Sequence, residues 1–278
     1  MKFWKMNGAG NDFIIINNIE EQIPEKDFSY LAKLLCERHL SIGADGMMFV
    51  VKATDGGDYR MEFFNSDGSK GEMCGNGARC ICRFGYENGL AGEIQKVETT
   101  AGLVIGRRID NRLYEVRLND PSIIKMDYEA ETDEGTFHCA YVELGNPGIP
   151  HAVLFSDITD ENRIHTIGRK IRYSSSFPKG ANVNFVELRA GANAYIRTYE
   201  RGVEDITYAC GTGTGSVGAV MALKAGKDSF SEKYDMRGGT LEINLKVEDG
   251  TVKDIFLTGP TNIVAKGEIT DEDLQFEN

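Results

Sequence analysis

The chain has 278 residues, of which 41% are hydrophobic and 27% are charged, which is typical of a water-soluble globular protein with a sizeable core. Its formal net charge of −12 disfavours binding to nucleic acid or to anionic membrane surfaces, so we expect a small-molecule partner. The first residues lack the apolar region of a secretion signal, and no segment has about 18 consecutive apolar residues. We therefore expect a cytoplasmic protein with free thiols rather than disulfides.

The first half of the chain mixes strand-like and helix-like segments. Asp27 is a candidate cap for a helix with apolar residues at Leu31, Leu34 and Leu35. In chain order, the predicted elements are a glycine-rich turn (5–12), a strand (13–16), the helix after Asp27, two strands (47–51 and 59–64), a largely buried helix (74–89) and a hairpin (103–118).

The second half is predicted to begin at Asp120-Pro121, because proline ends a strand, and a series of short strands is expected after it. The predicted elements are a strand (137–144), a helix (160–171), two strands (183–188 and 195–199), a helix of mostly small residues (210–226) and a hairpin (241–257). Each half is thus expected to wrap short strands around one buried helix.

One unusual turn occurs in both halves. Glu72-Met-Cys-Gly-Asn-Gly-Ala-Arg79 and Tyr208-Ala-Cys-Gly-Thr-Gly-Thr-Gly215 each place a cysteine before Gly-x-Gly and a predicted helix. A helix N-terminus favours a thiolate and binds anions such as a carboxylate. Two such thiols on opposite faces of one carbon could remove a proton and return another, which inverts a stereocentre without a cofactor.

Other chemistry has weaker support. A single free cysteine is most often a small buried hydrophobe, and Cys36, Cys80, Cys82 and Cys139 are interpreted in that way. Gly213-Thr-Gly-Ser-Val-Gly218 has the letters of a dinucleotide-binding motif, but a hairpin rather than alternating strands and helices follows it. The cysteines and four histidines show no zinc-ligand spacing, so no metal site is predicted.

Several further stretches, together with the two cysteine motifs, resemble the cofactor-independent amino-acid racemases and epimerases, and within them those that act on diaminopimelate. They occur in the family's order and span positions 5 to 213. The similar stretches are Lys5-Met-Asn-Gly-Ala-Gly-Asn-Asp-Phe13, Gly43-Ala-Asp-Gly46, Phe64-Asn-Ser-Asp-Gly68, Met73-Cys-Gly-Asn-Gly-Ala-Arg-Cys80, Pro150-His151, Asn182-Val-Asn184, Tyr199-Glu-Arg-Gly202 and Ala209-Cys-Gly-Thr-Gly213.

The resemblance implies an α+β fold of two pseudo-symmetric lobes, each a β-barrel-like sheet around a central helix. Residues 1–119 would form the N-terminal lobe, to which residues 264–278 return, and residues 120–263 would form the C-terminal lobe. The active site is expected between the lobes. No pyridoxal phosphate or metal is implied, and the assembly is left open between a monomer and a homodimer.

The resemblance also implies roles for individual residues. Cys74 and Cys210 would be the catalytic acid and base. The residues expected to bind substrate are Asn11, Asn65, Gly75, Asn76, Asn182, Glu200, Arg201, Gly211 and Thr212. The Gly75-Asn76 and Gly211-Thr212 backbones would bind the reacting carboxylate, Glu200 would lie near the ammonium, and Arg201 would pair with the distal carboxylate, since a guanidinium forks onto a carboxylate.

The chain departs from the family at Gly145-Asn-Pro-Gly-Ile-Pro-His151, where the family commonly has Gly-x-Pro-His. If His151 aligns, the family's substrate-binding asparagine falls on Ile149, unless Asn146 reaches in from the turn. Asn146 and His151 are therefore both candidate substrate-binding residues.

Three functions are compatible with these residues. The first is conversion of L,L-diaminopimelate to the meso form for lysine and cell-wall synthesis, as the resemblance implies. The second is racemisation of another amino acid, such as histidine, by the same mechanism. The third is a binding or redox-sensing protein that retains the fold. The Glu200-Arg201 pair favours the first over the second, and the two intact cysteine motifs disfavour the third.

Overall fold

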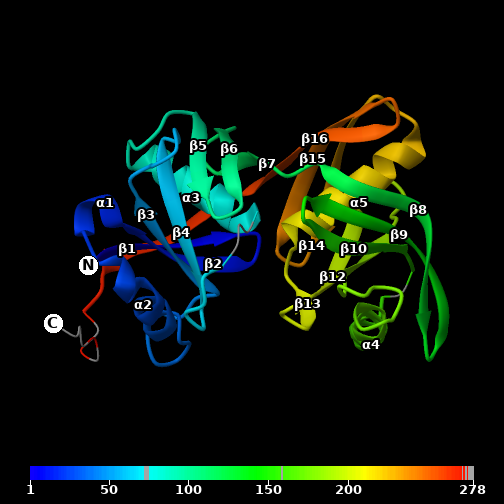
Figure 1. The fold of residues 1–278 in the computed structure, drawn as a ribbon, viewed down its shortest axis with the longest axis horizontal. Coiled ribbons are helices and arrows are strands. Elements are labelled where there is room, and N and C mark those ends of the chain that lie inside the picture. Colours follow the sequence, from blue (N-terminus) through cyan, green and yellow to red (C-terminus); the bar gives the residue numbers. More distant parts are fainter. Residues whose placement is uncertain (72–74, 158, 271, 273, 275–278) are drawn as a thin grey trace. The chain divides into compact units, whose positions relative to one another are not determined.

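The computed structural model describes residues 1–71, 75–157, 159–270, 272 and 274 (Figure 1). The chain forms two compact units, Met1–Val116 with Pro260–Asn278 (unit 1) and Arg117–Gly259 (unit 2). The chain therefore passes from one unit to the other after Val116 and returns after Gly259. The expected boundaries, after residues 119 and 263, lie a few residues further along the chain in each case.

Unit 1 is a sheet whose strands are joined by both antiparallel and parallel pairs. Strands β1 and β2 form a hairpin, β2 is parallel to β3, β3 is antiparallel to β4, β4 is parallel to β5, and β5, β6 and β7 pair antiparallel. The returning C-terminal strand β17 pairs with β1. The elements are β1 (Lys2–Gly8), β2 (Asn11–Asn17), α1 (Asn18–Glu21), η1 (Glu25–Asp27), α2 (Phe28–Leu35), β3 (Gly46–Val51), β4 (Tyr59–Asn65), α3 (Gly75–Glu87), β5 (Ile94–Thr99), β6 (Gly102–Arg108), β7 (Leu113–Arg117) and β17 (Asn262–Glu268).

Unit 2 repeats this order of pairings. Strands β8, β9 and β10 pair antiparallel, β10 is parallel to β11, β11 is antiparallel to β12, β12 is parallel to β14, and β14, β15 and β16 pair antiparallel. The elements are β8 (Pro121–Thr132), β9 (Gly135–Gly145), β10 (Gly148–Phe155), α4 (Glu161–Arg172), β11 (Asn182–Glu187), β12 (Ala194–Glu200), β13 (Asp205–Thr207), α5 (Gly211–Ala225), β14 (Ser229–Met236), β15 (Gly239–Glu248) and β16 (Thr251–Pro260).

The two units therefore share one plan. The run from β1 to β7 matches the run from β9 to β16, helix α2 matches α4, and helix α3 matches α5, while β13 is an addition in unit 2. The predicted α+β fold, with strands around one central helix in each half, is confirmed. The match also aligns the two halves residue by residue. The pair Phe13–Gly46, between β2 and β3 of unit 1, corresponds to the pair His151–Asn182, between β10 and β11 of unit 2.

The central helices are buried because small residues let strands approach them closely. Most of α5 is buried, and a Cβ atom at Gly218 would lie only 2.6 Å from the side chain of Ile243. In α3, a Cβ atom at Gly77 would lie 2.4 Å from the side chain of Met48. These glycines lower intrinsic helix stability, so packing against the strands must stabilise both helices.

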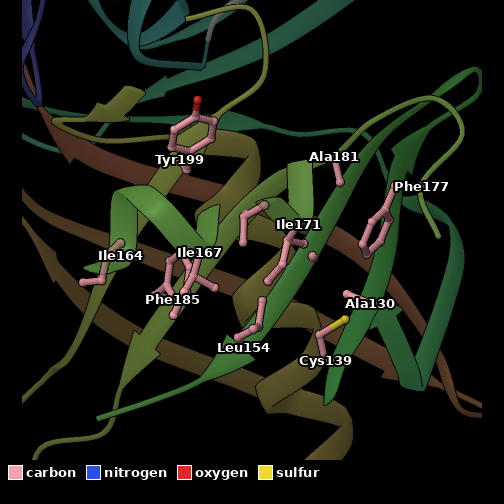
Figure 2. Packing of buried hydrophobic residues seen from close by; sticks show 12 residues of the cluster. Ala130, Cys139, Leu154, Ile164, Ile167, Ile171, Phe177, Ala181, Phe185 and Tyr199 are labelled. Atoms are coloured by element: carbon pink, nitrogen blue, oxygen red, sulfur yellow. The ribbon is translucent and has the colours of Figure 1, made fainter. Parts of the chain in front are cut away.

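The two outer helices are amphipathic and cover one face of the sheet in their own unit. Figure 2 shows Ile164, Ile167 and Ile171 of α4 packed with Leu154 and Phe185 from the strands. Each fully buried side chain of this kind contributes about 1.5–3 kcal/mol of transfer free energy. Helix α2 does the same with Phe28, Leu31 and Leu35, and the Phe28 ring stacks on Phe49 with centroids 3.8 Å apart.

Three local expectations are wrong. Residues 5–8 belong to strand β1 rather than to a turn, which is confined to Ala9 and Gly10, both at positive φ. Pro121 opens a long strand instead of a series of short ones. Helix α2 begins at Phe28 as expected, but the Asp27 side chain makes no capping hydrogen bond, because a preceding 3₁₀ turn already gives Asp27 a helical backbone.

Candidate active site

Cys210 lies at the N-cap of the buried helix α5, as the sequence predicts. Its backbone is extended, and its Sγ accepts a hydrogen bond from the Gly213 N–H at 3.3 Å. The Thr212 hydroxyl lies 3.5 Å from the same sulfur. Free N–H groups and the helix dipole at this end favour a thiolate and an anionic ligand. In this setting Cys210 can act as a base.

The other described cysteines have different surroundings. All five described cysteines are free. Burial raises the pKa of the Cys36, Cys82 and Cys139 thiols to about 12, so these groups stay protonated at neutral pH. Their structural interpretation from the sequence is in accord with this burial.

A network of buried polar groups lies beside the Cys210 turn. Asn184 donates from Nδ2 to the Ala152 carbonyl at 3.0 Å, and its Oδ1 accepts from the Thr198 hydroxyl at 2.9 Å. A Cβ atom at Gly213 would lie 2.3 Å from Asn184 Oδ1 and 3.2 Å from Cys210 Sγ. Only glycine therefore fits between the asparagine and the thiol.

His151 lies beside this network in strand β10 and is fully buried. Its Nδ1 is 3.3 Å from Asn184 Nδ2, and its Nε2 has no hydrogen-bond partner among the described residues. Burial, with a further contribution from the positive charge of Arg201, lowers the pKa of His151 to about 3. The imidazole is therefore neutral at physiological pH, and a donation from Asn184 to Nδ1 would place the ring proton on Nε2.

Asn182, Glu200 and Arg201 are brought together at the ends of β11 and β12. Asn182 is buried, and its Oδ1 accepts from the Arg201 N–H at 2.7 Å. Burial raises the pKa of the Glu200 carboxyl above its usual value. The Arg201 guanidinium donates to the Lys179 carbonyl at 2.9 Å and forms no ion pair with a described carboxylate, so it retains donors for an anionic ligand. Together with Cys210, Gly211, Thr212, His151 and Asn184, these three residues form what we call the C-terminal half-site.

The matching part of unit 1, the N-terminal half-site, consists of Asn11, Asp45, Gly75, Asn76 and Arg79. Helix α3 begins at Gly75, the residue after Cys74 in the sequence, and Cys74 itself lies outside the described residues. Asn76 donates from Nδ2 to Asn11 Oδ1 at 2.7 Å, and its own Oδ1 accepts from Arg79 at 2.7 Å. Asn11 and Asn76, two of the residues expected to bind substrate, therefore bond to each other at the start of α3.

The Asn11 amide, which bonds Asn76 through its oxygen, bonds a group of charged residues through its nitrogen. Asn11 Nδ2 donates to Asp45 at 3.1 Å, and Arg38 bridges Asp45 and Asp12, at 2.8 Å from each. Although burial raises the pKa of the Asp12 carboxyl, bonds from Lys5 and Arg38 outweigh that effect and lower it below its usual value. These ion pairs fix the turn that precedes β2.

Two of the residues expected to bind substrate, Asn65 and Asn146, are exposed. Asn65 is exposed at the end of β4, and its side chain donates to the Ser69 hydroxyl at 3.0 Å, which is the turn-forming role of an asparagine. Asn146 is exposed in the turn between β9 and β10. In the alignment of the two halves, His151 corresponds to Phe13. Ile149, two residues before His151, therefore corresponds to Asn11, two residues before Phe13.

Sequence reasoning missed three polar residues of these half-sites. Asn184, Asp45 and Arg79 all lie in the recognised stretches, but none was assigned a role. Comparing the halves position by position could have singled them out, because Asn184 corresponds to the apolar Met48 and Arg79 to Gly215.

In the described ranges, no three His, Cys, Asp or Glu side chains are grouped to hold a metal ion. No described helix is both long and apolar enough to cross a membrane.

Each half-site can bind an anion at a helix start and provides amide side chains around it. In unit 2 the thiol lies at the same helix end, and in unit 1 the sequence places a thiol next to it. The arrangement therefore suits removal of a proton beside a carboxylate.

Comparison with known proteins identifies close relatives over the whole chain. A family model described as diaminopimelate epimerase matches residues 3–124 and 144–264. A diaminopimelate epimerase of Methanothrix thermoacetophila is 40% identical, with the alignment covering 99% of this chain and 98% of the relative. One of Aquifex aeolicus is 37% identical over 99% of this chain and 100% of its own length.

Solved structures with low sequence identity share the fold. A phenazine biosynthesis protein of the PhzF family from Bacillus anthracis has a TM-score of 0.71 at 16% identity, covering 97% of this chain and 98% of its own. A probable proline racemase from Agrobacterium radiobacter has a TM-score of 0.70 at 15% identity, covering 97% of this chain and 92% of its own. At these identities the likeness extends to the fold alone.

Proposed function

The chain belongs to the diaminopimelate epimerase family, and on that premise we propose that it inverts one α-carbon of L,L-diaminopimelate by proton transfer between Cys74 and Cys210. It is thus an isomerase, and the product is meso-diaminopimelate, an intermediate for lysine biosynthesis. The observation that carries the proposal is the N-cap position of Cys210 on a buried glycine-rich helix, in a motif that the sequence repeats at Cys74. The role of Cys74 rests on the sequence.

The proposed reaction begins with one cysteine as thiolate and the other as thiol. The thiolate takes the α-proton, so that an S–H bond forms and the C–H electron pair moves into the carboxylate. Backbone N–H groups at Gly75-Asn76 and Gly211-Thr212 bind that carboxylate and stabilise the added negative charge. The opposite thiol then gives its proton to the other face of the carbon. We propose that both half-sites act on a single carbon.

The remaining substrate groups are assigned to polar residues. Asn11, Asn65 and Asn182 bind the amino-acid ends, Glu200 lies near the reacting ammonium, and Arg201 pairs with the distal carboxylate. His151 is a further candidate contact, supported by its buried Nε2, which has no hydrogen-bond partner in the part of the chain that the structure describes. Asn146 stays a weaker candidate, because it is exposed in its turn.

Racemisation of another amino acid is not favoured, since the full-length relatives named above are diaminopimelate epimerases. Proton exchange at the α-carbon of L,L-diaminopimelate, L-histidine and L-glutamate tests the choice directly. We expect the fastest exchange in L,L-diaminopimelate. Faster exchange in a monocarboxylate such as L-histidine would reject the proposal. We also propose that the protein is located in the cytoplasm, because thiols stay reduced in that compartment.

Replacing Arg201 by Ala is expected to lower kcat/KM for L,L-diaminopimelate roughly tenfold or more, because a charge-assisted hydrogen bond contributes about 1.5–3 kcal/mol. Steady-state kinetics of the purified variant measure this. The matched control is Arg189→Ala, which removes an exposed arginine bonded to Glu187. An unchanged kcat/KM in Arg201→Ala would remove this residue from substrate recognition.

Activity is expected without pyridoxal phosphate and after dialysis against a chelator, because the proposed chemistry needs only two thiols and the helix N-termini. The measurement is turnover of L,L-diaminopimelate before and after chelation, with and without added pyridoxal phosphate. Activity that depends on either addition would contradict the two-cysteine scheme.

A further inference from the structure

We propose that Asp45 is a positioning residue of the N-terminal half-site, because together with Arg79 it fixes the orientation of the Asn76 and Asn11 side-chain amides. The proposal rests on the proposed function in one respect, that these two asparagines lie at the substrate. Asp45 itself is assigned no contact with substrate.

The four side chains form one directional series of hydrogen bonds. Arg79 donates to Asn76 Oδ1 at 2.7 Å, Asn76 Nδ2 donates to Asn11 Oδ1 at 2.7 Å, and Asn11 Nδ2 donates to Asp45 Oδ2 at 3.1 Å. A guanidinium can only donate, and an ionised carboxylate can only accept. With those two groups at the ends, only one orientation of each amide satisfies all three bonds.

Both ends of this series are held in place. Arg79 is fully buried and also donates to the Gly75 carbonyl at 3.3 Å, which ties it to the first turn of α3. Asp45 is partly exposed, but its second oxygen accepts from Arg38 at 2.8 Å, and its Oδ2 also accepts from the Asp12 N–H at 3.2 Å. The carboxylate therefore cannot turn away from Asn11 without losing other bonds.

The series is present in only one of the two repeated units. The strand pairings and the two cysteine motifs align unit 2 with unit 1 residue by residue. In that alignment Asn11, Asp45, Asn76 and Arg79 correspond to Ile149, Ala181, Thr212 and Gly215, in that order. None of the four unit 2 residues is charged or carries an amide. Maintenance of the fold that both units share therefore does not require the series, which points to a role particular to the N-terminal half-site.

Fixed amides matter for a ligand because the two ends of an amide group have opposite hydrogen-bonding character. In the fixed orientation, Asn11 retains one N–H and one oxygen lone pair for a substrate. Without Asp45, one bond from Asn76 instead of two bonds holds the Asn11 amide, so the amide reorients more easily and can present oxygen where nitrogen is needed. Preorganised donors of this kind lose their advantage when they must reorient during the reaction.

The test is a double-mutant cycle on kcat/KM with Asp45→Ala, Asn11→Ala and the combined variant. Asp45→Ala is expected to lower kcat/KM about tenfold in the otherwise unchanged protein, and less than about twofold when Asn11 is already Ala. The control is Asp58→Ala, which removes an exposed carboxylate of the same unit that accepts from the Lys96 N–H and takes no part in the series, and should change kcat/KM less than about threefold. Equal losses from Asp45→Ala in both backgrounds, or a loss from Asp58→Ala as large as that from Asp45→Ala, would overturn the proposal.

A second measurement does not depend on activity. In ¹⁵N spectra, the side-chain NH₂ signals of Asn11 and Asn76 should shift or broaden in Asp45→Ala and stay in place in Asp58→Ala. Unchanged signals in Asp45→Ala would overturn the positioning role. Failure of the unchanged enzyme to turn over L,L-diaminopimelate would instead refute the proposed function, and the spectra would still decide the role of Asp45.

Discussion

Replacing Cys210 by Ala is expected to reduce epimerisation of L,L-diaminopimelate by about 10²–10⁴-fold, the usual contribution of a positioned acid or base. Cys74→Ala should have a loss of the same order, because each thiol provides one face of the α-carbon. The measurement is formation of the meso isomer by chiral chromatography. The Cys210→Ala fold should survive, since the helix that follows is held by packing of its buried residues from Gly211 to Ala222.

The control for this prediction is Cys139→Ala, a buried thiol whose pKa is raised by its apolar surroundings. It should lower the free energy of unfolding slightly and leave turnover near that of the unchanged protein. Full inversion by either the Cys74→Ala or the Cys210→Ala protein would rule out the two-base scheme.

Gly213→Ala should also cause a large loss, because its new methyl group would overlap Asn184 Oδ1 and press against Cys210 Sγ. Either the thiol or the asparagine must move, and displacement of a catalytic group by about 1 Å can reduce the rate about 10²-fold. We expect kcat/KM for L,L-diaminopimelate to fall by that order, as measured by steady-state kinetics.

Gly218→Ala is the matched comparison on the same helix. Its methyl group would crowd Ile243 in the core, remote from the thiol, so the expected result is a lower melting temperature with kcat/KM retained. If the two variants lost activity equally, crowding of α5 in general rather than displacement of Cys210 would explain the effect.

The features that the sequence predicted correctly are those that depend on local pattern. The small-residue helix after Cys210, the hairpin of β6 with β7 and the outer helix near Asp160 follow from spacing and turn residues. The structure adds that the Asp160 side chain caps this helix by accepting from the Asn162 N–H, whereas the predicted cap, Asp27, makes no such bond.

Other features depend on distant parts of the chain. Lys5 and Asn7 look like turn residues, yet β1 forms because β2 and β17 pair with both of its edges. The role suggested here for Asp45 comes from bonds to Asn11 and Arg38, which no local pattern reveals. The role of Cys74 remains a prediction from the sequence, since this residue lies outside the described ranges.

The most direct test of the account is a single-enantiomer reaction in deuterium oxide, followed by NMR during the first turnovers. The two-thiol mechanism predicts that the meso product carries solvent deuterium at the inverted carbon, while unreacted L,L-diaminopimelate keeps its α-protons. This follows because one cysteine removes the proton and the other, already exchanged with solvent, delivers deuterium to the opposite face. Deuterium in the unreacted L,L form as early as in the product, or no meso product at all, would contradict the account.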